Sequence, residues 1–263
     1  MKLWFFLLLG AATATDCLAA TSPVPQDAQT VGKFTLSTGF DYSTGKYGQT
    51  DSTDIVSVPL VLQWEVSLWT VKLTVPYLRV SGPSNVIAGV GALSNANPPA
   101  NETRSGLGDV VATASYYIYN DTAEGLIVDL SGEIKFGTAS SSRGLGTGKE
   151  DFEGQMDIYK SVGSMTPFAS FGYRLVGSPA GVTLNNVAFG SLGVDDKIVG
   201  GTNVGASFLI QERMSSSVDP AHELTVYVSH RMTGDWRVQG YVLTGFTNAS
   251  PKFEVGGMVG HTF

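Results

Sequence analysis

The feature that most constrains the fold is an alternation of apolar and polar residues with a period of two, repeated along most of the chain. Between residues 69 and 77, for example, an apolar or aromatic side chain stands at every odd position. Successive side chains of a β-strand point to opposite faces, so this pattern predicts strands with one apolar and one polar face. After the first 20 residues no segment shows a helical stripe, and the predicted fold class is all-β.

The alternation predicts twelve strands. Each is about ten residues or longer, the length of a tilted strand that crosses a bilayer. The predicted strands are 33–42, 54–65, 68–80, 107–119, 126–137, 151–162, 166–176, 187–197, 202–214, 222–232, 235–246 and 252–263.

The connections between these strands alternate in length. Tight turns such as 163–165 and 233–234 are followed by longer segments, of which 81–106 is the longest. Short turns on one rim and long loops on the other are typical of an outer-membrane barrel. We therefore predict a transmembrane antiparallel β-barrel of about 12 strands, with short periplasmic turns and long extracellular loops. Lipid offers no hydrogen bonds to an open sheet edge, so the first and last strands are expected to pair.

Aromatic residues gather at both predicted rims, as expected for side chains that favour the two water–lipid boundaries. The alternative is that they belong to an ordinary soluble core. The predicted belt at the short turns contains Trp64, Trp69, Tyr119, Trp236 and Phe263. The belt at the long loops contains Phe40, Tyr42, Tyr77, Phe136, Phe152, Phe246 and Phe253.

The composition agrees with this architecture. Only 15% of the residues are charged and 43% are hydrophobic, whereas about a quarter of an average chain is charged. Lipid would cover much of the apolar surface. A net charge of −7 provides no basic surplus for phosphates, so no nucleic-acid partner is expected. No second run of about 20 apolar residues follows the N-terminus, which excludes a helical membrane protein.

The first 20 residues resemble a secretory signal. Lys2 precedes the apolar run 3–12, and Leu18-Ala19-Ala20 forms a small-residue cleavage site. A membrane anchor is the alternative, but the run is short for a bilayer span. The predicted organisation is a signal peptide over 1–20, a periplasmic lead-in over 21–32 and a barrel domain over 33–263. The predicted location is the cell outer membrane.

The last predicted strand ends at Phe263. It resembles the terminal strand of bacterial outer-membrane proteins, whose final phenylalanine is read by the barrel-assembly machinery. The resemblance implies that this machinery and outer-membrane lipid are partners of the chain.

If the apolar side chains of each strand face lipid, the side chains at the alternate positions line the lumen. Lys135 and Glu153 lie on neighbouring strands and could pair across them. The polar interior fits a narrow permeation path, but also a packed interior whose ion pairs hold the wall together. Twelve strands fall between the number typical of a barrel filled by side chains and the number typical of a barrel with an aqueous channel. The strand number therefore does not decide whether the lumen is open. The lumen-lining candidates are Lys72, Asp129, Glu133, Lys135, Glu153, Asp157, Arg174, Glu223, Arg231 and Arg237.

The middle of the long segment 81–106 is apolar, which a fully solvated loop does not require. Val86, Ile87, Val90 and Leu93 are therefore candidates for a constriction or a hydrophobic capture surface in the barrel mouth. The alternative is a loop that packs against its neighbours.

Several segments resemble the family of outer-membrane proteins linked to the meta-cleavage pathway of phenol degradation. The resemblance implies a barrel that takes up small, often aromatic, compounds, and it carries over no catalytic or ligand residues. Phe136 stands where the family usually has proline. The similar segments are Val75-Pro76-Tyr77, Gly106-Leu107-Gly108-Asp109, Lys135-Phe136-Gly137-Thr138, Leu145-Gly146-Thr147-Gly148 and Ala169-Ser170-Phe171-Gly172-Tyr173.

The three histidines give little support to an enzyme. Adjacent Ser229 and His230 point to opposite faces of a strand, His261 is expected to face lipid, and His222 has no nucleophile at strand spacing. No catalytic residue, metal or cofactor is predicted. The predicted function is passive transport of a small-molecule solute, and the alternatives are a closed barrel with a structural or surface-interaction role and an outer-membrane hydrolase.

Overall fold

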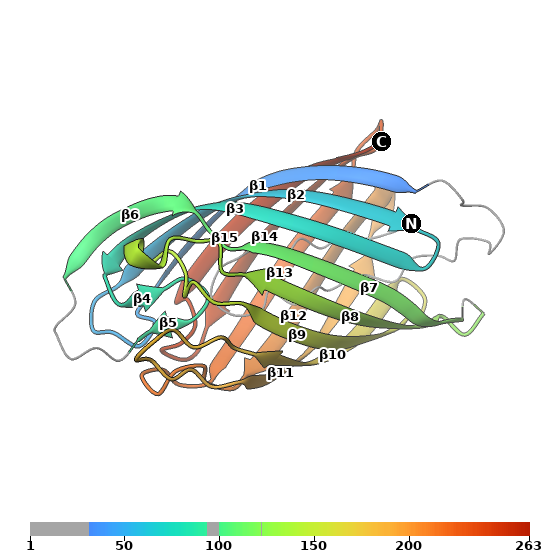
Figure 1. Ribbon diagram of the computed structural model, residues 1–263. Helices are drawn as coiled ribbons and strands as arrows, with labels where there is room; N and C mark the ends of the chain where they lie inside the picture. Colours follow the sequence, from blue (N-terminus) through green and yellow to red (C-terminus); the bar gives the residue numbers. More distant parts are fainter. Residues whose placement is uncertain (1–31, 94–99, 122) are drawn as a thin grey trace.

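The computed structural model describes residues 32–93, 100–121 and 123–263, which form a closed antiparallel barrel of twelve strands (Figure 1). The predicted signal peptide and residues 21–31 of the lead-in lie outside the described residues. The barrel strands are β1 (Lys33–Gly45), β2 (Thr53–Val66), β3 (Trp69–Pro83), β7 (Val110–Asp121), β8 (Leu126–Phe136), β9 (Asp151–Lys160), β10 (Met165–Leu175), β11 (Val187–Lys197), β12 (Thr202–Gln211), β13 (Ala221–Arg231), β14 (Trp236–Gly245) and β15 (Phe253–Thr262).

The first and last strands close the barrel, as predicted. β1 pairs antiparallel with β15, from Thr35 opposite Thr262 to Thr44 opposite Phe253. The backbone N–H of Phe263 donates to the carbonyl of Phe34 at 2.8 Å. No edge among these strands is left without a partner strand, so their backbone groups are satisfied without water.

The segment 81–106 is not one long loop, and the prediction is wrong there. β3 continues to Pro83, and a further strand, β6 (Asn101–Leu107), pairs with this extension before β7 takes over. β6 and β7 thus make one strand interrupted at Gly108 and Asp109. The sequence of β6 is almost entirely polar, because this part of the wall lies beyond the apolar band, and it therefore lacks the alternation that marked the other strands.

The two faces of the wall differ as the alternation predicts. On β2 the side chains of Leu60 and Leu62 are 51% and 45% exposed, whereas Val61 between them is 1% exposed. All residues of the two predicted aromatic belts are on the outside and more than a third exposed, except Tyr42, which is half-buried. Among the described residues no helix is long and apolar enough to cross a membrane.

Large inward side chains fill the middle of the barrel and lie against glycines of the neighbouring strand. Tyr227 is opposite Gly205, and a Cβ atom on that glycine would lie 2.1 Å from the phenol oxygen. Gly256 leaves the same space for the ring of Tyr241. The packed interior cluster comprises Val61, Ile127, Tyr159, Phe168, Tyr227, Tyr241, Leu243 and Met258.

Candidate functional site: the barrel mouth

A small hairpin occupies the long-loop end of the barrel. β4 (Val86–Ile87) pairs with β5 (Gly91–Ala92), and the turn between them is closed by a hydrogen bond from the N–H of Val90 to the carbonyl of Ile87 at 3.1 Å. Gly89 has a φ of +79°, a conformation that favours glycine. Asn85 holds the base, because its Nδ2 donates to the carbonyl of Leu93 at 2.8 Å.

The hairpin contacts two opposite parts of the mouth. On the side of β2 and β3, Val86 and Ala92 belong to a buried cluster. On the side of β10 to β12, Val90 and Leu93 pack against a second cluster. The first cluster is completed by Tyr47, Ile55, Leu78, Val80, Ala139 and Leu145, and the second consists of Val176, Leu184, Val187 and Met214.

Hydrogen bonds fix the hairpin at the same two places. The N–H of Ala92 donates to the carbonyl of Tyr47, and Ser215 Oγ donates to the carbonyl of Ala92, both at 2.8 Å. Val86 and Ile87 are buried. The structure therefore places the four apolar loop residues predicted from the sequence in the mouth, where they pack against the strand ends and the neighbouring loops.

Arg104 of β6 anchors the hairpin from the wall. Its guanidinium donates to the carbonyls of Val86 and Gly144 and forms an ion pair with Glu102 at 3.3 Å. The side chain is only 4% exposed. Arg104 thus links the hairpin to the loop that contains the short turn η1 (Ser141–Arg143). Arg104 is not among the residues predicted from the sequence, because the pattern around position 104 indicates a loop.

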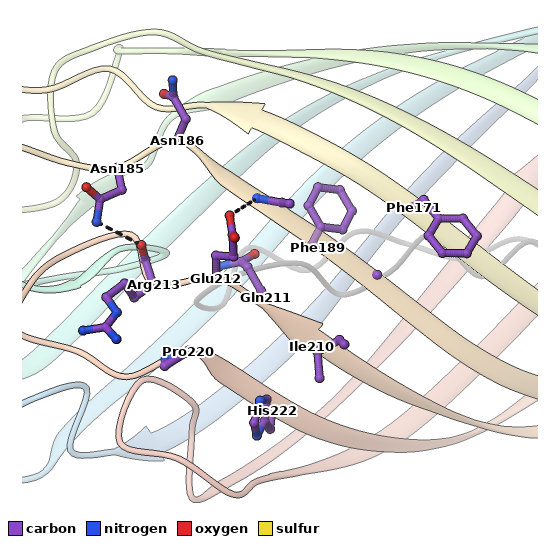
Figure 2. A pocket seen from close by; sticks show the side chains of 12 residues that line it. Phe171, Asn185, Asn186, Phe189, Ile210, Gln211, Glu212, Arg213, Pro220 and His222 are labelled. Atoms are coloured by element: carbon purple, nitrogen blue, oxygen red, sulfur yellow. Dashed lines mark hydrogen bonds between the residues drawn. The ribbon is translucent and has the colours of Figure 1, made fainter.

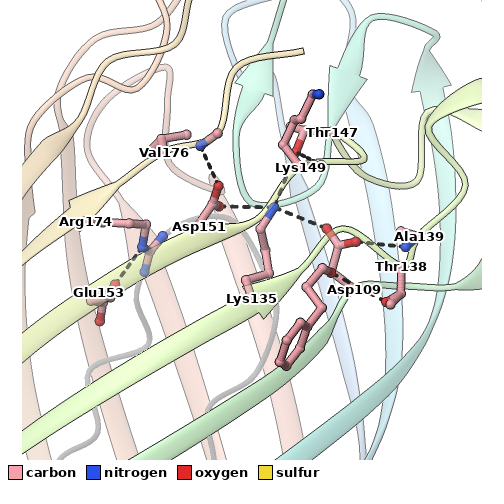
Figure 3. A network of polar contacts seen from close by, with 12 residues as sticks. Asp109, Lys135, Thr138, Ala139, Thr147, Lys149, Asp151, Glu153, Arg174 and Val176 are labelled. Atoms are coloured by element: carbon pink, nitrogen blue, oxygen red, sulfur yellow. Dashed lines mark hydrogen bonds and ion pairs between the residues drawn. The ribbon is translucent and has the colours of Figure 1, made fainter.

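One side of the interior, from β7 to β10, carries charges that are paired (Figure 3). We call it the paired wall and define it as Asp109, Lys135, Asp151, Glu153 and Arg174. Lys135 Nζ lies 3.3 Å from Asp109 Oδ2 and 3.1 Å from Asp151 Oδ2. Arg174 Nε donates to Glu153 Oε2 at 2.6 Å.

A pair between Lys135 and Glu153 does not form. The register sets Lys135 opposite Asp151 and places Glu153 opposite Glu133. Glu153 bonds instead to Arg174, which the register sets opposite it on β10. The strand assignment was right, but pairing depends on register, which the hydrophobic pattern leaves open to shifts by two residues.

The carboxylates of the paired wall also hold the long loops. Asp109 Oδ1 accepts a hydrogen bond from the N–H of Ala139 at 2.8 Å. Asp151 Oδ1 accepts one from the N–H of Gly177, also at 2.8 Å. Each carboxylate therefore joins a lysine of the wall to the backbone of a loop.

The opposite side, formed by β13, β14, β15 and β1, is different. We call it the acidic wall and define it as Asp41, Glu223, Tyr241 and Glu254. The hydroxyl of Tyr241 donates to Asp41 and lies 2.8 Å from Glu254 Oε1. Among the described residues no lysine or arginine forms an ion pair with these three carboxyl groups. One oxygen of each is buried without a hydrogen-bond partner.

Tyr47 stands above the acidic wall, in the loop between β1 and β2. Its side chain is fully buried, and its hydroxyl donates to Ser43 Oγ at 3.0 Å. Burial raises the pKa of the Tyr47 phenol far above its usual value. The hydroxyl is therefore a constant donor, and this residue connects the hairpin to the wall below it.

The remaining lumen candidates lie on the inward face, mostly nearer the short turns. Lys72, Asp129 and Asp157 are buried there, and Asp157 accepts hydrogen bonds from Gln155 at 2.9 Å and from Ser170. Glu133 accepts from Thr113 at 3.1 Å. The two arginines differ: Arg237 is buried, whereas Arg231 lies opposite it at the end of β13 and is exposed to solvent.

The histidines lie in three separate environments. His222 faces the ring of Phe208, His230 Nδ1 lies 2.9 Å from Thr202 Oγ1, and the ring of His261 sits between two aromatic rings of the short-turn rim. Within residues 32–93, 100–121 and 123–263, no group of three or more histidine, cysteine or acidic side chains could hold a metal ion.

Comparison with known proteins supports the fold. No family model and no curated protein matches the sequence. The COG4313 outer membrane channel from Pseudomonas putida F1 superposes with a TM-score of 0.68 at 14% identity, covering 92% of this chain and 100% of that one. The KdgM porin gives 0.55 at 8% identity, covering 87% and 99%. The NanC porin gives 0.53 at 12% identity, covering 86% and 97%. The chain therefore shares the barrel fold of these outer-membrane channels.

Proposed function

We propose that the protein is an outer-membrane channel for small molecules whose mouth is closed by the β4–β5 hairpin in the conformation described here. The observation that carries the proposal is the combination of an apolar outer face, a polar interior and a hairpin that reaches across the mouth. An exposed apolar face this extensive fits a lipid surround better than water. The shared fold with outer-membrane channels supports the same assignment.

Export and assembly follow from this proposal. Residues 1–20 act as the cleavable signal peptide, and the barrel-assembly machinery reads the terminal strand. Phe263 is 75% exposed at the end of that strand, so its ring is accessible to a partner. Outer-membrane lipid then covers the apolar face.

A small aromatic or hydrophobic compound is the solute class that we propose. The resemblance of several segments to the phenol-degradation family supports this choice. So does the mouth itself, because the hairpin presents Val90 and Leu93 to an apolar cluster and inward tyrosines follow below it. A solute with an apolar body and one polar group would find both kinds of contact along this path.

The packed interior cluster also favours a second function, that of a closed barrel with a structural or surface-interaction role. Conductance across planar bilayers separates the two functions. In the variant V86D/I87D, two carboxylates enter an apolar cluster and expel the hairpin. We expect its single-channel conductance to rise at least about twofold over wild type, because the constriction is lost.

The matched control is I198D/V199D, which places the same charges at exposed positions on the short-turn rim. Its conductance should stay at the wild-type value. Flux of a phenol-type solute into liposomes is measured in parallel. If neither wild type nor V86D/I87D conducts ions or passes solute, the closed barrel is the correct function. Heat-modifiable gel migration and outer-membrane fractionation test the location, and recovery from the soluble periplasm would contradict it.

A further inference from the structure

A groove crosses the outer face of the barrel over β10 to β13, close to the long-loop end (Figure 2). Its volume is about 830 Å³, within the range of small-molecule binding pockets. Neither the lumen nor the hairpin uses it.

Small residues make the groove. The register sets Phe171, Gly190, Ile210 and His222 side by side in one row across four strands. Phe171 and Ile210 project outward and are 54% and 51% exposed, while Gly190 between them has no side chain. Ala188, two residues along β11, continues the same floor. A Cβ atom on Gly190 would meet its nearest neighbour at 3.3 Å, which demands only a small adjustment, so packing alone does not explain the glycine.

The groove changes from apolar to polar along its length. The row at Gly190 is apolar, and Asn185 and Arg213 stand at the end near the loops. Glu212 is already engaged, because its Oε2 accepts a hydrogen bond from the N–H of Ala188 at 2.9 Å. Asn185 Nδ2 donates to the carbonyl of Arg213 at 3.2 Å. Among the described residues no carboxylate forms an ion pair with the guanidinium of Arg213, so this guanidinium is available to an anionic group of a ligand.

We propose that the groove binds an anionic, phosphate-bearing lipid of the outer leaflet, with an acyl chain over Ala188 and Gly190 and the phosphate on Arg213. The inference rests on the proposed location in the outer membrane. The direction of the groove fits such a lipid, because the apolar floor lies deeper in the wall and the arginine lies at the rim, where headgroups are found. A planar guanidinium can also bind a phosphate through two hydrogen bonds.

The test is native mass spectrometry of the purified barrel, titrated in detergent with dioleoyl-phosphatidylglycerol or dioleoyl-phosphatidylcholine. We expect wild type to retain the anionic lipid more tightly. Gly190→Leu fills the floor, and we expect both lipids to bind about tenfold more weakly. Arg213→Gln removes the charge, and the anionic lipid alone should lose about tenfold in affinity. The controls are Ala114→Leu, on the outer face of β7, and Lys252→Gln, at the same rim.

Each variant is first checked for heat-modifiable migration, so that only folded barrels are compared. Equal retention of the two lipids, or variants that match their controls, would reduce the groove to ordinary lipid contact and overturn the inference. Loss with Arg213→Gln but not with Gly190→Leu would also overturn it, since the acyl chain would then lie elsewhere. A dimer peak that disappears in Gly190→Leu would assign the groove to a second copy of the chain. All these outcomes leave the channel function standing, which conductance and fractionation test separately.

Discussion

The two sides of the barrel mouth handle buried charge in different ways. On the paired wall, Lys135 lies between Asp109 and Asp151, and the two carboxylates also accept backbone hydrogen bonds from the loops above (Figure 3). On the acidic wall, Asp41 and Glu254 share the hydroxyl of one tyrosine. Within the described part of the chain, no cation offsets them.

The difference separates two tasks within the barrel mouth. The paired wall holds loops in place, because each of its carboxylates connects the strand wall to a loop backbone. The acidic wall turns three buried carboxyl groups toward the interior, and among the described residues no lysine or arginine forms an ion pair with them. Two carboxyl groups that contact one hydroxyl repel each other when both are ionised, so this wall is expected to hold a proton or attract a cation.

The largest predicted effect is on the paired wall. Lys135→Met removes the shared cation and leaves two buried carboxylates, so we expect the free energy of unfolding to fall by about 3–5 kcal/mol. Urea unfolding of the barrel in lipid vesicles measures this. The control is Lys197→Met, at an exposed strand end. A loss no greater than that of the control would show that the wall does not depend on this lysine.

The next effect is on the acidic wall. Tyr241→Phe removes a hydroxyl that donates to Asp41 and contacts Glu254, and the free energy of unfolding should fall by about 1–3 kcal/mol. Tyr173→Phe, on the outer face, serves as the control in the same urea experiment. Equal stability of the two variants would mean that the hydroxyl does not hold the carboxyl pair together.

A smaller effect distinguishes the walls directly. Glu254→Gln relieves the repulsion with Asp41 and supplies an amide donor, so the free energy of unfolding should change by about 1 kcal/mol or less, without a clear loss. Asp109→Asn on the paired wall weakens an ion pair and should cost more. The comparison is contradicted if Glu254→Gln proves the more destabilising of the two.

The smallest predicted effect is on ion selectivity. At alkaline pH, where the buried carboxyl of Glu223 is ionised, wild type should prefer cations. Glu223→Gln should then lower the reversal potential in a salt gradient by on the order of a few millivolts, because salt screens a single charge over about 8 Å. The double variant E153Q/R174Q removes one charge of each sign and should leave the reversal potential unchanged. A larger shift of the reversal potential in the double variant than in Glu223→Gln would contradict the proposed difference in charge between the two walls.

Much of the fold could be predicted because the barrel has only two environments. Every strand that separates lipid from a polar interior has to alternate, and closure follows from the hydrogen bonds that lipid does not provide. β6 was not predicted, because it lies beyond the apolar band and its residues therefore do not alternate between apolar and polar. The hairpin was foreseen as an apolar segment, but its position between two clusters depends on contacts with strand ends far away in the sequence.

The candidate site could be predicted only in part. The alternation of apolar and polar residues places Lys135, Glu153 and Arg174 on the inward face. Their ion-pair partners depend on the register between neighbouring strands. Asp41 was not among the lumen-lining candidates, although the alternation over 33–42 places it on the polar face of that strand. Arg104 could not be found without β6. Inward-facing residues are thus readable from periodicity, whereas their pairing is a property of the closed barrel.

The rings that lie over glycines have a consequence for assembly. If β13 slid by one residue along β12, Tyr227 would turn to the outer face, and a slide by two would bring its ring over Ser207 or Asn203 in place of Gly205. The same holds for Tyr241 over Gly256 on β15, close to where the barrel closes. Each ring therefore fits at one alignment only. In a misaligned barrel the ring would have no space beside the neighbouring strand.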